Sequence, residues 1–258
     1  MQRLDCHGSK GVIRGTVCHC ILLCGLGETK TIRLICCFRL VVSWRCGCGM
    51  VRDEKPRTVY WLGDKVYLNI TNKCSNRCIF CFRNFKRGVG DFTLWLDVEP
   101  SFEQVTMELE EAMRKRAWRE IVFCGFGEPT ERLDLLLEVA RWIKQRCGKS
   151  VVVRVDTNGH GYVLNANRDV AGELKAAGVD KVSVSLNAHD EEAYNEVCKP
   201  GFAGAYAAVL EFIEEAKGKL DVEVTAVTTP EVDLHKVEDL AKRMCVKFRL
   251  RVCIPCFW

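Results

Sequence analysis

From residue 60 onward, short stretches that alternate apolar and polar residues are followed by longer segments whose apolar residues recur every three or four positions. Alternation at every second residue is typical of strands, and the longer spacing is typical of amphipathic helices. The pattern predicts strands at 66–71, 119–124, 150–157, 181–187, 221–228 and 246–252. It predicts helices at 101–116, 131–148, 168–177, 203–217 and 233–244. We interpret this order as six βα units, which form a parallel sheet with helices outside it.

The parity of the strands distinguishes an open sheet from a barrel. In the strand at 181–187, apolar and polar residues face opposite sides, with Val182, Val184 and Leu186 against Ser183, Ser185 and Asn187. An open sheet covered by helices on both sides would be apolar on both faces, and a closed barrel would fill its centre with Val, Ile and Leu. The inward charges Arg154, Asp156 and Glu223 need partners or solvent. The sequence therefore predicts an α/β fold, a partial (βα)6 TIM-like barrel whose hollow holds a ligand.

The first fifty residues differ in composition from the rest of the 258-residue chain. They contain eight of its 17 cysteines and show no sustained period. An extra metal site could use Cys18, His19, Cys20 and Cys24, or Cys46 with Cys48. The alternative, which we favour, is that translation begins at Met50. We expect residues 1–49 to be a Cys-rich segment that is disordered or precedes the true start, and residues 50–258 to be the core domain.

The net charge of +4 is also concentrated at the N-terminus. Residues 1–60 hold ten Lys and Arg against four Asp and Glu, so the remainder is nearly neutral, which argues against a broad nucleic-acid surface. We see neither a signal peptide nor an apolar run long enough to span a membrane. We expect a cytoplasmic protein whose thiols stay reduced. Cys253 and Cys256 have no neighbouring partner pair, so a ragged C-terminus explains them better than a metal site.

Three cysteines, Cys74, Cys78 and Cys81, follow the first predicted strand at spacings of four and three. This position is the carboxyl end of the strand, where α/β barrels carry their catalytic residues. Three thiolates would leave one iron of a [4Fe–4S] cluster free, whereas structural zinc needs four protein ligands. Zinc with a distant fourth ligand such as Cys124 is the alternative.

The stretch "CSNRCIFC" resembles the C-x₃-C-x-aromatic-C signature of the radical S-adenosylmethionine (SAM) enzymes, with Phe80 in the aromatic position. "GFGEPT" at 125–130 resembles the Gly-Gly-Glu-Pro motif of that superfamily, with Phe126 between the glycines. The resemblance implies a [4Fe–4S] cluster on the three cysteines, and SAM beside Gly125, Gly127 and Glu128.

The segment "DTNGHG" after the third strand resembles glycyl-radical activating enzymes. That resemblance implies that Asp156, Thr157 and Asn158 lie beside SAM. Ser185 and Asn187 end the fourth strand with inward parity, so they are candidates for contacts to the ribose and carboxylate of SAM. His160, His189 and His235 are expected on loops or helix surfaces rather than as ligands, although His160, which follows the third strand, could face the site.

Residues 66–252 as a whole look like the TatD-linked radical SAM family, whose substrate is not established. The resemblance implies reductive cleavage of SAM to a 5′-deoxyadenosyl radical that removes hydrogen from an unidentified substrate. It also implies an electron donor such as ferredoxin or flavodoxin, and a TatD-like hydrolase as a candidate partner. Membrane and nucleic-acid partners are not expected.

Two other functions stay open. One is an activase that generates a glycyl radical on a partner protein, as "DTNG" and the small size suggest. The other is a zinc-binding nucleic-acid or structural module. On the last predicted strand, Lys247, Arg249 and Arg251 give the hollow a positive wall, which suggests an anionic substrate.

Overall fold

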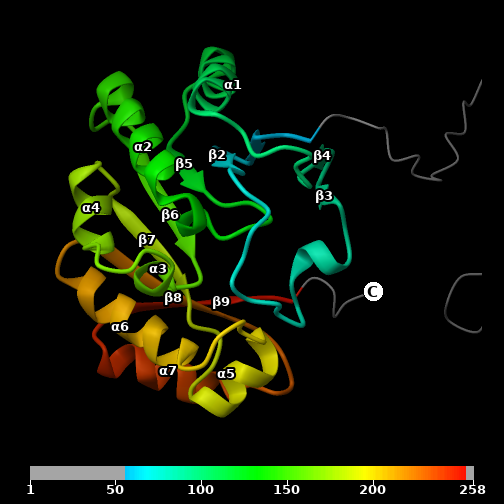
Figure 1. The fold of residues 1–258 in the computed structure, drawn as a ribbon, viewed down its shortest axis with the longest axis vertical. Coiled ribbons are helices and arrows are strands. Elements are labelled where there is room, and N and C mark those ends of the chain that lie inside the picture. Colours follow the sequence, from blue (N-terminus) through cyan, green and yellow to red (C-terminus); the bar gives the residue numbers. More distant parts are fainter. Residues whose placement is uncertain (1–55, 254–258) are drawn as a thin grey trace, which may run out of the picture. The chain divides into compact units, whose positions relative to one another are not determined.

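The computed structural model describes residues 56–253, and these form a partial barrel (Figure 1). Six parallel strands pair in chain order: β2 (Lys65–Leu68), β5 (Glu120–Phe123), β6 (Val152–Thr157), β7 (Lys181–Ser185), β8 (Asp221–Val227) and β9 (Lys247–Arg251). A further strand, β1 (Val59–Leu62), pairs antiparallel with β2 at the edge. Within the described residues, edge strands β1 and β9 do not pair with each other. The predicted partial (βα)6 architecture is confirmed.

Helices lie along the outer side of the sheet, as Figure 1 shows for α2, α4, α6 and α7. They are α1 (Phe102–Lys115), α2 (Leu133–Cys147), α3 (Gly161–Leu164), α4 (Val170–Ala176), α5 (Glu191–Cys198), α6 (Ala205–Lys217) and α7 (Leu234–Arg243). Short 3₁₀ turns occupy Phe82–Asn84 and Pro129–Arg132, and a small hairpin pairs β3 (Gly88–Val89) with β4 (Phe92–Thr93). None of the described helices is long and apolar enough to cross a bilayer.

The predicted parity of the strands is also confirmed. On β6, Val153 and Val155 are fully buried against the helices, whereas Arg154 and Asp156 face the hollow side. Because neighbouring strands are in register, the same two faces continue across the sheet. Strand β9 departs from the pattern, since Phe248 packs on the core but Leu250 is 47% exposed.

The sequence interpretation did not include β1, the β3–β4 hairpin, α3 or α5. Strand β1 is the first arm of a hairpin whose turn includes Gly63, at a φ of +59° that favours glycine. Helix α5 begins after Asp190, whose side chain accepts a hydrogen bond from the Ala193 amide. No helix follows β9 within residues 56–253, so five of the six expected βα units are complete there. The predicted segment 1–49 and Cys256 lie outside the described residues.

Candidate cofactor site

The three cysteines of the sequence motif lie on one loop, between β2 and the turn at Phe82–Asn84, and all three are partly buried. Backbone hydrogen bonds fix this cysteine loop to the end of α5, because the Ile79 amide donates to the Val197 carbonyl at 2.9 Å. A second backbone bond, from the Glu128 amide to the Lys73 carbonyl at 2.7 Å, joins it to the loop after β5. Beside Cys74 lies a hollow of about 650 Å³.

The environment of the thiols fits a metal cluster. Burial, followed by the Glu128 carboxylate, raises the pKa of Cys74 to about 12, and burial raises the pKa of Cys81. A bound metal centre would lower these pKa values and stabilise the thiolates. Within the described residues, no three His, Cys, Asp or Glu side chains converge on one metal ion. Ligation of three separate irons suits this spacing better than a single zinc ion.

Two further cysteines lie near this region. Cys124, the alternative fourth ligand for zinc, faces the hollow of the barrel, where its thiol contacts Asp156. Cys198, which the sequence interpretation missed, is buried beneath the cysteine loop beside the Cys78 thiol. The hydrogen bond to Cys198, together with burial, raises the pKa of Cys78. Nothing in the local sequence around Cys198 distinguishes it from an ordinary core cysteine.

Glu128, in the predicted SAM motif, is 3% exposed, and both of its carboxylate oxygens accept hydrogen bonds from the protein. Its carboxylate accepts hydrogen bonds from the Thr130 amide and hydroxyl at 3.1 and 2.8 Å. It also accepts from the Thr157 hydroxyl at 2.7 Å and the Asn158 amide at 2.6 Å. Burial raises the pKa of Glu128, and these hydrogen bonds oppose that rise. The side chain therefore joins the loops after β5 and β6.

The two glycines of the same motif allow close approach between loops. A Cβ on Gly127 would lie 2.4 Å from the Thr71 carbonyl oxygen, and one on Gly125 would lie 2.0 Å from the Asn69 side-chain oxygen. Phe126, between them, is buried in a small hydrophobic cluster with Tyr60 and Leu94. The glycines are thus required for loop packing, independently of any ligand contact.

A hydrogen-bond chain runs from the cysteine loop into the core. The Asn158 amide nitrogen donates to the Ser75 hydroxyl at 2.8 Å and lies 3.9 Å from the Cys74 sulfur. Its orientation is fixed, because the Asn158 oxygen accepts from the His160 amide at 3.0 Å. Ser75 lies 2.8 Å from His160 Nδ1. Asn158 therefore contacts the cysteine loop itself.

His160 continues this chain from its other ring nitrogen, which lies 3.0 Å from the Tyr194 hydroxyl. That hydroxyl also accepts from the Asn76 amide at 3.0 Å. Burial lowers the pKa of His160 to about 4, so its ring is neutral near pH 7. His160 lies on the loop after β6 and faces the cysteine loop, which agrees with the alternative position expected for it. The residue is fully buried, with its ring 4.8 Å from that of Phe202.

The remaining predicted site residues lie on the carboxyl halves of β6 and β7. Asp156 forms an ion pair with Arg154 at 2.9 Å, and Ser185 ends β7. Asn187, at a φ of +59°, donates to the Cys198 sulfur at 3.5 Å. Its side-chain oxygen is buried without a hydrogen-bond partner in the described part of the chain, and so is the hydroxyl of Thr225 on β8. Phe80 is half-buried against the core.

The two orphaned oxygens point to a missing ligand, because buried polar atoms are almost always hydrogen-bonded. The Asn187 amide donates to the Thr225 carbonyl at 3.0 Å, so the two residues adjoin each other. A bound ligand with hydroxyl or amino donors would satisfy both. Thr225 was not among the predicted residues, although its inward parity with Glu223 would have indicated it.

The fold and site together define a class of protein: a partial α/β barrel with a three-cysteine loop at the carboxyl edge of its sheet. The sequence model of the radical SAM superfamily matches residues 68–244, more than half of the chain. The protein belongs to this superfamily and is an iron–sulfur enzyme, and its cofactors are a [4Fe–4S] cluster and SAM.

Individual relatives match over part of their length. The chain is 29% identical over 180 residues to the GTP 3′,8-cyclase of Corynebacterium glutamicum (strain R), covering 68% of this chain and 44% of the relative. A probable GTP 3′,8-cyclase of Sulfolobus acidocaldarius is 33% identical over 150 residues, covering 58% and 42%. The chain thus spans less than half the length of these relatives.

Solved structures show the same fold at low identity. Streptococcus suis SuiB bound to S-adenosylmethionine has a TM-score of 0.56 and 13% identity, covering 74% of this chain and 40% of SuiB. Methylornithine synthase (PylB) has a TM-score of 0.53 and 14% identity, covering 74% and 53%.

We call the loop after β5, which carries Gly127 and Glu128, the motif loop. Substituting Gly127→Ala is expected to push the motif loop away from the cysteine loop, because the added Cβ meets two carbonyl oxygens. Chemical denaturation should show a loss of about 1–3 kcal/mol of unfolding free energy. The matched control is Gly218→Ala, where a Cβ meets nothing within 4 Å and the change should stay below about 1 kcal/mol. Equal effects of the two substitutions would contradict this packing role.

Substituting Tyr194→Phe is expected to cost about 1–3 kcal/mol of unfolding free energy, because it leaves polar atoms of His160 and Asn76 unpaired. Tyr206→Phe is the control, since the Tyr206 hydroxyl is buried without a hydrogen-bond partner in the described residues. The Tyr206→Phe substitution should lower the free energy of unfolding by at most about 0.5 kcal/mol, or raise it. A larger loss in the control than in Tyr194→Phe would refute the chain of hydrogen bonds.

Proposed function

We propose that the protein removes a hydrogen atom from a small substrate bound in the hollow of the barrel, using a SAM-derived radical. The observation that carries this proposal is the position of the cysteine loop, bonded by its backbone to the motif loop at the carboxyl edge of the sheet. The inward face below that edge is polar, so a hydrophilic substrate can be accommodated there. The reaction named for the cyclase relatives is not proposed here, because less than half of their length is matched.

Each residue of the site has a role in this proposal. Cys74, Cys78 and Cys81 would hold the cluster through three irons. When bound, the cluster and SAM supply one-electron cleavage of a sulfur–carbon bond, which yields methionine and a 5′-deoxyadenosyl radical. The backbone of Gly125 and Gly127 would face the amino group of SAM.

The polar residues at the ends of β6 and β7 complete the SAM site in this proposal. Asp156 and Asn158 would lie on one side of SAM, with Ser185 and Asn187 on the other. Asn158 is already oriented by the His160 amide, which reduces the entropy lost on binding. Phe80 would pack beneath the loop rather than contact the reacting atoms.

We further propose membership of the TatD-linked family within the superfamily, from the sequence features of residues 66–252. An electron donor such as ferredoxin or flavodoxin and a TatD-like hydrolase are the corresponding protein partners. A donor would approach the hollow beside Cys74, whose rim includes Lys73, Arg77 and Arg83. Acidic electron carriers would complement these three cations.

The variant Cys78→Ala tests the proposed function. Anaerobically reconstituted wild-type protein should contain about four irons per chain at this site and cleave SAM after reduction. The variant should lose the chromophore and SAM cleavage but keep its fold, as judged by circular dichroism. Cys245→Ala, at an exposed cysteine remote from the motif, should retain both. A colourless wild-type protein with one zinc per chain would instead favour the zinc-binding module.

A further inference from the structure

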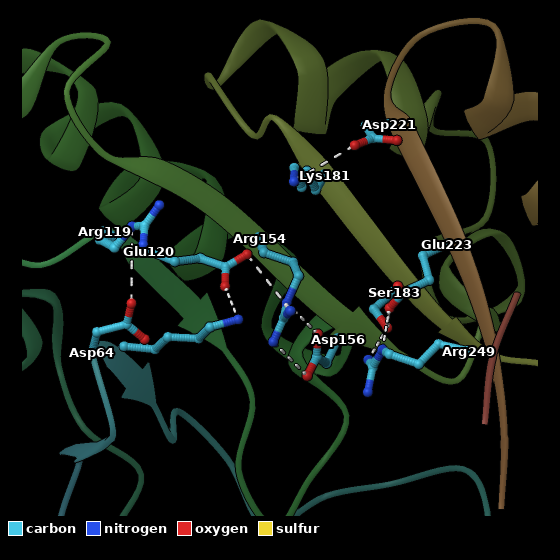
Figure 2. Close-up of polar contacts among 11 residues, drawn as sticks. Asp64, Arg119, Glu120, Arg154, Asp156, Lys181, Ser183, Asp221, Glu223 and Arg249 are labelled. Atoms are coloured by element: carbon cyan, nitrogen blue, oxygen red, sulfur yellow. Dashed lines mark hydrogen bonds and ion pairs between the residues drawn. The ribbon is translucent and has the colours of Figure 1, made fainter. Parts of the chain in front are cut away.

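A second cavity lies at the opposite end of the barrel from the cysteine loop. It has a volume of about 630 Å³ and is bounded by the amino-terminal halves of β2 and β5–β9. None of the predicted SAM-binding residues lines it. Volumes of this size are typical of small-molecule sites. Figure 2 shows the charged side chains that converge here from successive strands.

The lining of this cavity, which we call the floor site, is strongly charged. Ten of its thirteen residues are ionisable acids or bases: Asp64, Lys65, Arg119, Glu120, Arg154, Lys181, Asp221, Glu223, Lys247 and Arg249. Six of these are cations and four are anions, which leaves two positive charges in excess. An apolar ligand would desolvate these groups without compensation, so it is excluded.

The wall formed by β5 and β6 has little free charge. Glu120 lies 2.6 Å from Lys65 and 3.6 Å from Arg154. Arg154 also pairs with Asp156 just above the floor site (Figure 2). Two cations thus face two carboxylates, and Arg154 is only 14% exposed. Asp156 does not line the cavity, but its carboxylate cancels one of the two excess positive charges, so this wall leaves no cation in excess.

The positive excess lies on the wall formed by β7–β9. Asp221 is shared by two lysines, at 2.7 Å from Lys247 and 3.7 Å from Lys181 (Figure 2 shows the Lys181 pair). Arg249 donates to Glu223 at 2.7 Å and to the Ser183 hydroxyl at 3.3 Å, which holds its guanidinium in place. One carboxylate cannot neutralise both lysines, so this corner attracts an anion.

The ion pairs of β9 also correct the expectation of a positive wall on this strand. Arg249 is neutralised by Glu223, and Arg251 does not line the cavity. The unbalanced cation comes instead from Lys181 on β7, which sequence parity alone did not single out.

We propose that the floor site binds the anionic end of the substrate, a phosphate monoester or a dicarboxylate, at Lys181 and Lys247. This inference rests on the proposed function for the role of the bound molecule. To reach the cofactor end, such a substrate must span the distance of about 13 Å along β7 between Lys181 and Ser185. The reactive carbon therefore lies at the end of the molecule away from the anionic group.

Binding of inorganic phosphate and of succinate to the reconstituted holoenzyme, measured by calorimetry, tests the proposal. The two probes distinguish a phosphate from a dicarboxylate ligand. In the double variant Lys181→Gln/Lys247→Gln, affinity for the better probe should fall about tenfold. Asp221→Asn should have the opposite effect and strengthen binding, because it removes the shared carboxylate. Misfolding cannot produce this gain.

The control is Lys236→Gln, an exposed lysine on the outer helix α7, which should bind the probe as the wild type does. Failure of both probes to bind, or equal affinity in all variants, would overturn the proposal. If the wild type nevertheless carries the cluster and cleaves SAM, the proposed function stands without this inference. If the probes bind as expected and no cluster forms, the proposed function fails instead.

Discussion

The cofactor end of this barrel depends on one buried carboxylate. Glu128 belongs to the loop after β5, yet two of its four hydrogen bonds come from residues at the end of β6, and its own backbone amide holds the cysteine loop. Burying a charged group is costly unless every acceptor site is satisfied. Four donors offset much of that cost, three at Oε1 and one at Oε2, and together with the Glu128 backbone amide they link three loops. The position of the three cysteines therefore depends in part on the loop that Glu128 anchors.

Sequence reasoning recovered the features whose signal is local. Strand parity located Asp156 and Ser185 on the inner face, and the cysteine spacing located the loop. What it missed depends on contacts between distant segments. Helix α5 is eight residues long, and its importance emerges only where its last carbonyls bind the amides of the cysteine loop. His160 has the same sequence signal whether it lies at the surface or in the core.

The pairing of charged side chains was likewise only partly predictable from the sequence. Parity placed Lys247 and Arg249 on the inner face, but it did not show which acids they meet. Their register partners on β8 are Glu223 and Thr225, whereas their ion-pair partners are Asp221 and Glu223. Each cation thus reaches diagonally to an acid two residues before its register partner. Such diagonal pairing depends on the twist of the sheet and on the direction of the side chains. The excess positive charge at Lys181 could therefore be identified only from the structure.

The cofactor end and the floor of the hollow differ in how deeply their polar groups are buried, and this difference affects how each end binds a ligand. At the cofactor end, Asn187 and Thr225 are at most 3% exposed, and each has an unpaired oxygen. Satisfying such atoms contributes strongly to affinity, since leaving them unpaired is costly. At the floor, Lys181 and Lys247 are 43% and 68% exposed, so solvent and salt weaken their attraction. Screened charges of this kind discriminate between ligands more than they tighten binding. In the proposed arrangement, the buried end would therefore hold SAM firmly, and the floor would select the substrate by its charge.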